Sequence, residues 1–137
     1  MDSNDYSRSV NLKTSIKTNL YATPAPLSWA VKSDGILYTS QIPINADGNV
    51  VEGGIAAQSI QVMENLISTL NSAGEDAESV LQVLIYVTDR SYLNVFNGIY
   101  GKYFDAPYPN RAAMIVAGLA REEMLVELVV YAQVKKE

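Results

Sequence analysis

Two residues in the last third of the sequence, a glutamate and an arginine, are of types that do acid–base or ligand-binding chemistry. Glu127 lies inside the apolar run 124–134. Because strand side chains alternate between faces, it would share a face with Val129 and Tyr131. A carboxylate among such residues needs a partner, since its charged form is costly away from water. Arg111, which opens the preceding apolar segment, could lie in the same region.

The residue types alone leave three interpretations of this pair open. Glu127 could act on a ligand or a water molecule, it could form a structural ion pair with Arg111, or it could face water at the rim of a sheet. Structural ion pairs also perturb carboxylates, so a carboxylate in an unusual environment is not by itself a functional one.

The segment Arg111–Ala132 is predicted to be a β-hairpin that carries both residues. Its first arm, 111–119, is small and apolar after the arginine, and its second arm, 124–134, is β-branched or large and apolar. The polar residues 120–123 between the arms are predicted to make the turn.

Length and composition predict one globular domain at residues 15–137, preceded by a flexible polar tail at residues 1–14. The net charge of −5 argues against a nucleic-acid backbone as the main partner. The chain has no cysteine and no histidine, which excludes thiol catalysis, disulfides and metal sites built on these residues. No apolar run is long enough to span a membrane, so we expect a cytoplasmic protein without a membrane partner.

Apolar periodicity and turn residues predict an α+β domain. The clearest helix is Ile55–Ser72, where apolar residues recur at helical spacing before Gly74. A second helix is predicted to begin after a Ser91 cap and to run to about Phe104. Further strands or extended segments are predicted at Lys13–Tyr21, Leu27–Val31, Ile36–Ile44 and Ser79–Thr88.

Two of the predicted strands, 79–88 and 124–134, are apolar on both faces, as strands buried on both sides are. Two helices can cover one face of a sheet of five or six strands, and nothing else in the chain can cover the other. An open apolar face of that size is an association surface. We therefore expect a homo-oligomer in which subunits bury these faces against each other.

Several motifs of the sequence resemble those of the RidA/YjgF family of reactive-intermediate deaminases. The P-N-R-A-A run at 109–113 and the V-E-L run at 126–128 are similar to the family's signature. So are T-S-Q-I-P at 39–43, Q-V-M-E-N-L at 61–66, and V-T-D at 87–89 leading to N-G-I-Y at 97–100. The resemblance extends from about residue 25 to the C-terminus, with the same element order.

This resemblance implies a chorismate-mutase-like fold and a homotrimer with ligand sites at the subunit interfaces. It also implies hydrolysis of small carboxylate-bearing enamines and imines, such as 2-aminoacrylate or 2-iminobutyrate, to 2-oxo acids and ammonia. The chain would then be a hydrolase similar to 2-iminobutanoate/2-iminopropanoate deaminases. An imine is already electrophilic, so neither a cofactor nor a metal is expected.

The resemblance also assigns roles to residues of this sequence. Arg111 matches an arginine that clamps the substrate carboxylate, for which a planar guanidinium is suited. Glu127 matches a glutamate that positions the attacking water and could act as its general base. Ser40 matches a serine that hydrogen-bonds the ligand, and Asn97 matches an asparagine near the site. Ala113 shares a motif with Arg111 and is expected to line the substrate site.

The sequence departs from the family pattern at three places. Leu27 stands where the family commonly has a tyrosine, which removes a hydroxyl group and an aromatic ring. The family's Ser-Gly-Gln is here Ser40-Gln41, and the loss of one residue either removes a bulge or turns later side chains to the other face. The turn at 120–123 is one residue longer than usual, which we expect to be harmless.

These departures keep two alternatives to the deaminase open. One is a non-catalytic trimer that binds a small carboxylate ligand in its interface clefts. The other is a pathway-specific enzyme that accepts a bulkier or less polar substrate beside Leu27.

Overall fold

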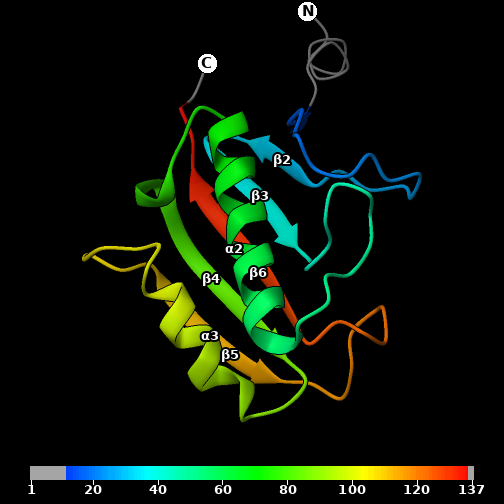
Figure 1. The fold of residues 1–137 in the computed structure, drawn as a ribbon. Coiled ribbons are helices and arrows are strands. Elements are labelled where there is room, and N and C mark those ends of the chain that lie inside the picture. The colour runs from blue at the N-terminus through cyan, green and yellow to red at the C-terminus, as the bar shows by residue number, and fades with distance from the viewer. Residues whose placement is uncertain (1–11, 136–137) are drawn as a thin grey trace, which may run out of the picture.

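The computed structural model describes residues 12–135, which form one mixed sheet with two α-helices on one of its faces (Figure 1). The order of strands across the sheet is β1-β2-β3-β6-β4-β5, and every neighbouring pair is antiparallel except β4 and β5. The predicted α+β class, with a six-stranded mixed sheet, is confirmed. The strands are β1 (Thr14–Ser15), β2 (Ala30–Ser33), β3 (Ile36–Gln41), β4 (Val80–Val87), β5 (Asn110–Ile115) and β6 (Val126–Gln133).

The long helix α2 (Gly54–Ser72) follows the predicted apolar stripe. Val62, Met63, Leu66 and Leu70 are fully buried against the sheet. The helix ends before Gly74, whose φ of 77° is a left-handed conformation that glycine adopts without steric cost. The periodicity of the sequence therefore predicted this element within one residue of its start.

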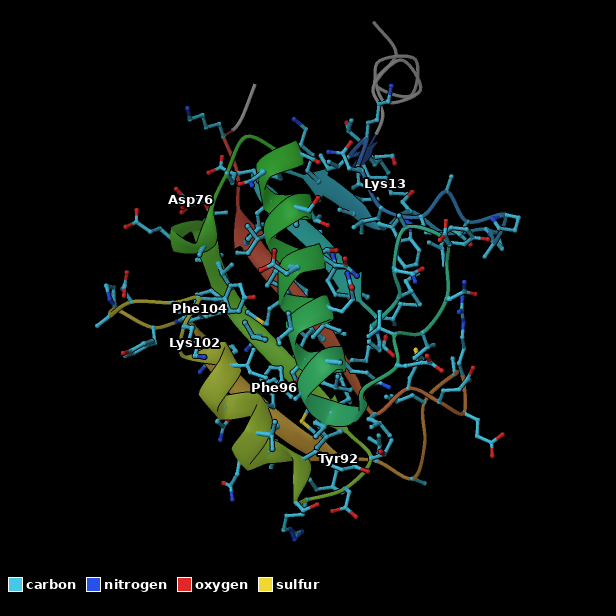
Figure 2. All side chains as sticks on the ribbon, in the orientation of Figure 1. Lys13, Asp76, Tyr92, Phe96, Lys102 and Phe104 are labelled. Atoms are coloured by element: carbon cyan, nitrogen blue, oxygen red, sulfur yellow. The ribbon has the colours of Figure 1, made fainter. Side chains whose placement is uncertain are left out.

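The second helix, α3 (Tyr92–Tyr100), is shorter than predicted and begins differently. Ser91 does not cap it, because Ser91 Oγ instead donates a hydrogen bond of 2.6 Å to Asp89, two residues before it. The helix ends at Tyr100, after which successive N–H groups bond three residues back in a tighter turn. Phe96 within the helix and Phe104 beyond it are both buried in the core (Figure 2).

The N-terminal part contains less regular strand than predicted. The predicted strand Lys13–Tyr21 is reduced to the two residues of β1, and the predicted strand Ile36–Ile44 ends at Gln41 as β3. A short 3₁₀ turn, Ala77–Ser79, leads into β4. The predicted flexible tail falls outside the described residues up to residue 11, and Thr14 pairs with Lys32 in the sheet.

The predicted hairpin Arg111–Ala132 is wrong, because its two arms do not pair with each other. β5 pairs with β4 in parallel, and β6 lies on the other side of β4, between β4 and β3. The connecting segment 116–125 therefore passes the end of β4 instead of making a tight turn. Two-residue to five-residue loops are the usual hairpin connections, and the whole of 116–125 exceeds that length.

The two faces of the sheet differ in what covers them. On the helix-covered face, side chains of β4 and β6 are fully buried in the core; these are Val83, Ile85, Val87, Val126, Leu128 and Val130. The alternating side chains are only partly buried on the uncovered face; these are Leu84, Tyr86, Glu127, Val129 and Tyr131. One face is thus covered by the chain's own helices and the other, largely apolar, is not, as the sequence predicted. The homo-oligomer itself stays a prediction.

None of the helices formed by residues 12–135 is long and apolar enough to cross a membrane.

Candidate functional site

Arg111 lies on the helix-covered face of the sheet, beside α3. In the parallel register of β4 and β5 it is opposite Val83, whose side chain is buried under the helices. Arg111 Nη2 donates a hydrogen bond of 2.8 Å to Asn97 Oδ1. The guanidinium carbon Cζ lies 4.7 Å from the centre of the Tyr100 ring. We call Arg111, Asn97, Tyr100 and the neighbouring Ala113 the arginine half-site.

The partners of Arg111 within the described chain are all neutral. Asn97 accepts one of its five N–H groups, and the Tyr100 ring offers the negative face of its π-system. No carboxylate among residues 12–135 forms an ion pair with Arg111. A partly buried guanidinium held by neutral groups keeps its positive charge available for an anionic ligand.

Sequence reasoning did not identify the contact between Tyr100 and Arg111. Asn97 and Tyr100 are three residues apart on α3, so both face the same neighbour. That spacing was the available signal, but it does not say which strand lies beside the helix. The Tyr100 hydroxyl is buried without a hydrogen-bond partner among the described residues, and burial raises its pKa, while the nearby Arg111 acts in the opposite direction.

Ala113 shares a face with Arg111, because the two are separated by one residue along β5. It is opposite Ile85 and its surface is exposed at the edge of the sheet. The structure therefore brings the predicted residues Arg111, Asn97 and Ala113 together on one side of the molecule.

Glu127 lies on the other, uncovered face of the sheet. It is opposite Tyr86 in the antiparallel register, and its neighbours Val126 and Leu128 are buried beneath the helices. Ser40 is opposite Val129, two residues from Glu127. The two are therefore diagonal neighbours on one face, with their Cβ atoms somewhat less than roughly 7–8 Å apart. We call Glu127, Ser40 and Tyr86 the glutamate half-site.

The Glu127 carboxylate is partly buried, and this burial raises its pKa above that of an exposed glutamate. No cation among the described residues pairs with it. The structural ion pair between Arg111 and Glu127 is therefore not formed within the chain. A carboxylate with a raised pKa is better suited to take up a proton near neutral pH than an ordinary one.

The register of β3 shows whether the glycine missing between Ser40 and Gln41 removes a bulge or turns side chains to the other face. β3 pairs with β6 residue for residue from Ile36 to Gln41, without a bulge. Ser40 is exposed on the uncovered face and Gln41 is buried on the helix-covered face. The shortened strand therefore keeps Ser40 on the same face as Glu127.

Leu27 lies in the segment before β2 with half of its surface exposed. Because Ala30 in β2 is opposite Thr39, this segment leaves the sheet at the end of β3 that carries Ser40. The segment that holds Leu27 therefore joins the sheet near the Ser40 end of β3.

A second residue that sequence reasoning missed is Gln58, buried on α2. Its Nε2 donates to the carbonyl of Glu123 at 2.9 Å, and its Oε1 accepts from the N–H of Leu125 at 2.7 Å. These bonds fix the backbone two residues before Glu127. Gln58 precedes the buried Val62 by one helical turn, which places it on the buried face, but its partners could not be read from the sequence.

The arginine and glutamate half-sites lie on opposite faces of the same sheet, so a single chain does not bring Arg111 and Glu127 together. Among residues 12–135 there is no cluster of three or more acidic side chains arranged as metal ligands would be.

Comparisons with known proteins identify the family of this fold. The sequence profile described as Endoribonuclease L-PSP matches residues 17–134. The chain belongs to the Endoribonuclease L-PSP family. A solved structure from Yersinia pestis, described as a protein of unknown function of the conserved Rid protein family, superimposes on this chain with a TM-score of 0.84. It is 36% identical and covers 89% of this chain and 99% of its own. The RidA/YjgF resemblance is thus confirmed.

Two curated members of the L-PSP family illustrate the range of relatives. A RutC family protein of Saccharolobus solfataricus is 38% identical over 110 residues, which are 79% of this chain and 86% of that protein. The human protein named 2-iminobutanoate/2-iminopropanoate deaminase is 36% identical over 98 residues, which are 70% of this chain and 72% of that protein.

Proposed function

We propose that this L-PSP family member hydrolyses small enamines or imines that carry a carboxylate, releasing a 2-oxo acid and ammonia. The observation that carries the proposal is Arg111, a partly buried cation whose partners Asn97 and Tyr100 are both neutral. Such a guanidinium is suited to bind a carboxylate with two parallel hydrogen bonds. The named activity of the human relative supports the same substrate class.

The separation of the half-sites supports a site shared between subunits. Arg111 and Glu127 lie on opposite faces of one sheet, so they can act on one ligand only if they come from different copies of the chain. We propose a homotrimer in which Arg111, Asn97 and Ala113 of one subunit meet Glu127, Ser40 and Leu27 of the partner subunit. Burial of the uncovered apolar sheet face would drive this association.

The chemistry at such a site needs only these side chains. An enamine first takes a proton from solvent water on carbon and becomes the iminium ion, the protonated imine, whose carbon is electrophilic. Glu127 accepts a proton from a water molecule as the water oxygen bonds to that carbon, which gives a carbinolamine. Glu127 then delivers this proton to nitrogen, the C–N bond breaks and ammonia leaves, while the carbinolamine hydroxyl loses its proton to solvent water as the C=O bond of the 2-oxo acid forms. Arg111 holds the carboxylate throughout and so fixes the imine carbon in place.

Cleavage of RNA, which the family description names, finds less support in this chain. The net charge of −5 disfavours a phosphate backbone. The chain also has no histidine, the commonest general acid or base for such chemistry.

The test is a trapping assay. Imines are generated in situ from several amino acids by an amino-acid oxidase in the presence of semicarbazide. The enzyme is then judged by how much imine it diverts to the 2-oxo acid. Deamination by the wild type that is lost in Arg111→Ala supports the proposal. Tight binding of 2-oxobutyrate without any deamination would instead establish the non-catalytic binding protein.

A further inference from the structure

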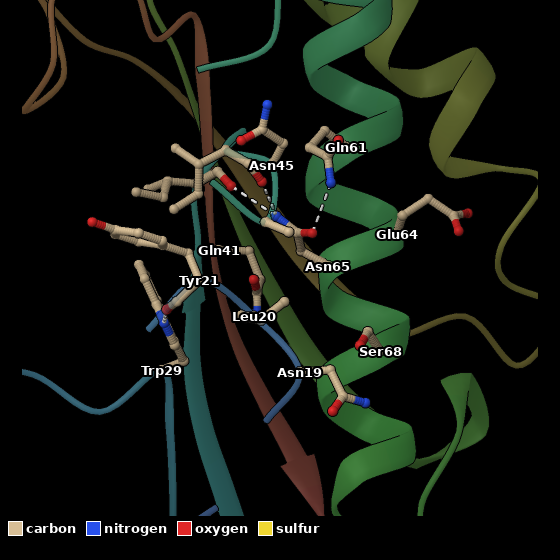
Figure 3. A pocket seen from close by; sticks show the side chains of 13 residues that line it. Asn19, Leu20, Tyr21, Trp29, Gln41, Asn45, Gln61, Glu64, Asn65 and Ser68 are labelled. Carbon is tan, nitrogen blue, oxygen red and sulfur yellow. Dashed lines mark hydrogen bonds between the residues drawn. The ribbon is translucent and has the colours of Figure 1, made fainter. Parts of the chain in front are cut away.

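A cavity of about 280 Å³ lies away from both half-sites, between residues 19–21, the end of β3 and helix α2 (Figure 3). None of Arg111, Asn97, Ser40 or Glu127 lines it. Asn19 and Ala46 at its margin are exposed, so solvent reaches it. Its volume is just below the range of roughly 300–1,000 Å³ that is typical of ligand pockets.

The most informative residue of the cavity is Gln41, which is 1% exposed and points from β3 into the space before α2 (Figure 3). Its Nε2 donates to the hydroxyls of Thr39 and Thr69, at 2.9 Å each. Both hydroxyl protons are already used, because Thr39 donates to the carbonyl of Trp29 and Thr69 donates to that of Asn65. Each hydroxyl can therefore only accept from Gln41, which fixes the orientation of the amide.

The orientation of Gln41 leaves its Oε1 as an acceptor on the cavity side. No donor among the described residues bonds to this oxygen. Gln41 Oε1 is not among the fully buried side-chain atoms left without a partner in the described residues, so it meets the solvent of the cavity, and a ligand N–H or O–H group could replace the water there.

The remaining sides of the cavity are polar and partly aromatic. Trp29 and Tyr21 lie together on one side, held by a 2.7 Å hydrogen bond from Trp29 Nε1 to the carbonyl of Tyr21. On α2, Asn65 Nδ2 donates hydrogen bonds to two backbone carbonyls, and Asn65 Oδ1 accepts one from Gln61. No lysine or arginine lines the cavity, and its one acidic residue, Glu64, accepts a 2.6 Å hydrogen bond from Tyr103 on its other side. Such a lining holds no cation that would attract an anion.

We propose that this cavity binds a neutral small molecule that presents an N–H or O–H donor to Gln41 Oε1 and lays a flat body against Trp29 and Tyr21. A ring compound of about ten non-hydrogen atoms is of suitable size for a pocket at the small end of the usual range. The ligand class differs from the carboxylate proposed for Arg111, so the cavity is a second site and does not depend on the proposed deaminase activity.

The test uses tryptophan fluorescence, because Trp29 is the single tryptophan of the chain and lines the cavity. Two probes of nearly equal shape are titrated into the full chain: benzamide, which carries N–H donors, and methyl benzoate, which carries none. We expect a saturable change in Trp29 emission with benzamide. Methyl benzoate should bind about fivefold to tenfold more weakly, because it lacks the one hydrogen bond to Gln41 Oε1.

Two variants locate the binding. Gln41→Leu removes the acceptor but leaves both threonine hydroxyls donating to their carbonyls, so it strands no buried donor; it should abolish the preference for benzamide. Ser68→Phe fills the cavity from α2 and should abolish the response to both probes. The matched control is Ile60→Phe, on the exposed side of the same helix (48% exposed), which should bind as wild type does.

Arg111→Ala should also bind benzamide normally, which separates this site from the proposed active site. The proposal is overturned if neither probe gives a saturable change in Trp29 emission at millimolar concentration. It is also overturned if Ser68→Phe responds as wild type does, or if Gln41→Leu keeps the preference for benzamide.

Discussion

The aromatic ring beneath Arg111 should control how well this chain binds small carboxylates. Arg111 Cζ lies 4.7 Å from the centre of the Tyr100 ring, inside the limit of about 6 Å for a cation–π contact. Such contacts contribute about 0.5–1 kcal/mol at exposed sites and about 2 kcal/mol when desolvated. Arg111 is partly buried, so we take about 1 kcal/mol for holding its guanidinium in place; without the ring this ordering becomes a cost of binding, which corresponds to about fivefold in affinity.

The perturbation is Tyr100→Leu, with Tyr100→Phe as its matched control. The leucine variant removes the ring and should weaken 2-oxobutyrate binding by about fivefold, as measured by titration calorimetry. It should also lower the melting temperature, because Tyr100 packs on Phe96 and Phe104 at ring-centre distances of 5.6 and 4.7 Å. Calorimetry is therefore done well below the melting temperature of both variants.

The phenylalanine control keeps the ring and removes only a buried hydroxyl that has no partner among the described residues. It should bind 2-oxobutyrate as wild type does and melt at the same or a higher temperature, since an unpaired buried hydroxyl costs about 1–3 kcal/mol. If Tyr100→Phe weakens binding as much as Tyr100→Leu, or if Tyr100→Leu binds normally, the ring does not hold Arg111 and the reasoning fails.

Four further predictions concern charge. Glu127→Gln should slow imine hydrolysis by roughly 10²–10⁴-fold with nearly unchanged 2-oxobutyrate affinity; normal turnover would remove Glu127 from the mechanism. Burial raises the pKa of Glu127 in the folded state, so at pH values above this pKa the ionised carboxylate lowers the stability of the fold. Glu127→Gln should therefore raise the melting temperature at neutral pH, and the increase should shrink as the pH falls through the folded-state pKa. Arg111→Ala should abolish carboxylate binding, and Arg111→Lys should fail nearly as badly because a point charge does not reproduce the guanidinium fork; equal dissociation constants for wild type and either variant would refute the clamp. Ile85→Asp places a charge in the core and should prevent folding, whereas Val129→Asp on the uncovered face should give a folded monomer; circular dichroism with light scattering distinguishes these from an intact oligomer.

The sequence predicted best what depends on local pattern. The apolar stripe through Val62, Met63 and Leu66 gave α2 almost to its ends, because a buried helix face repeats with the helical period. The alternation in β6 correctly set Glu127 on the face opposite Leu128. The boundaries of α3 were predicted less accurately. Ser91 was expected to cap the helix, but its side chain bonds to Asp89 instead. A serine can form either bond, and its residue type alone does not say which one it forms.

What depends on spatial neighbours was not predictable in the same way. β5 and β6 follow one another and are both apolar, which favoured a hairpin, yet β4 inserts between them because it is apolar on both faces and can pair on both edges. Arg111 and Glu127 consequently lie on opposite faces of the sheet, although the resemblance placed them in one site. The register of β4, β5 and β6 shows that one chain keeps the two residues apart. The proposed site between subunits would bring an Arg111 and a Glu127 from different chains together.

The position of β6 has a consequence for how the polypeptide is made. β6 lies between β3 and β4 in the sheet but follows both along the chain, so neither has that neighbour until β6 has been synthesised. Proteins are synthesised from the N-terminus, and an unpaired apolar strand edge is a template for aggregation. The pairing of β3 with β6 also joins residues far apart in sequence, which slows folding. A nascent chain that lacks β6 therefore has two strand edges without their native partner, and the sheet can be completed only after translation has passed residue 133.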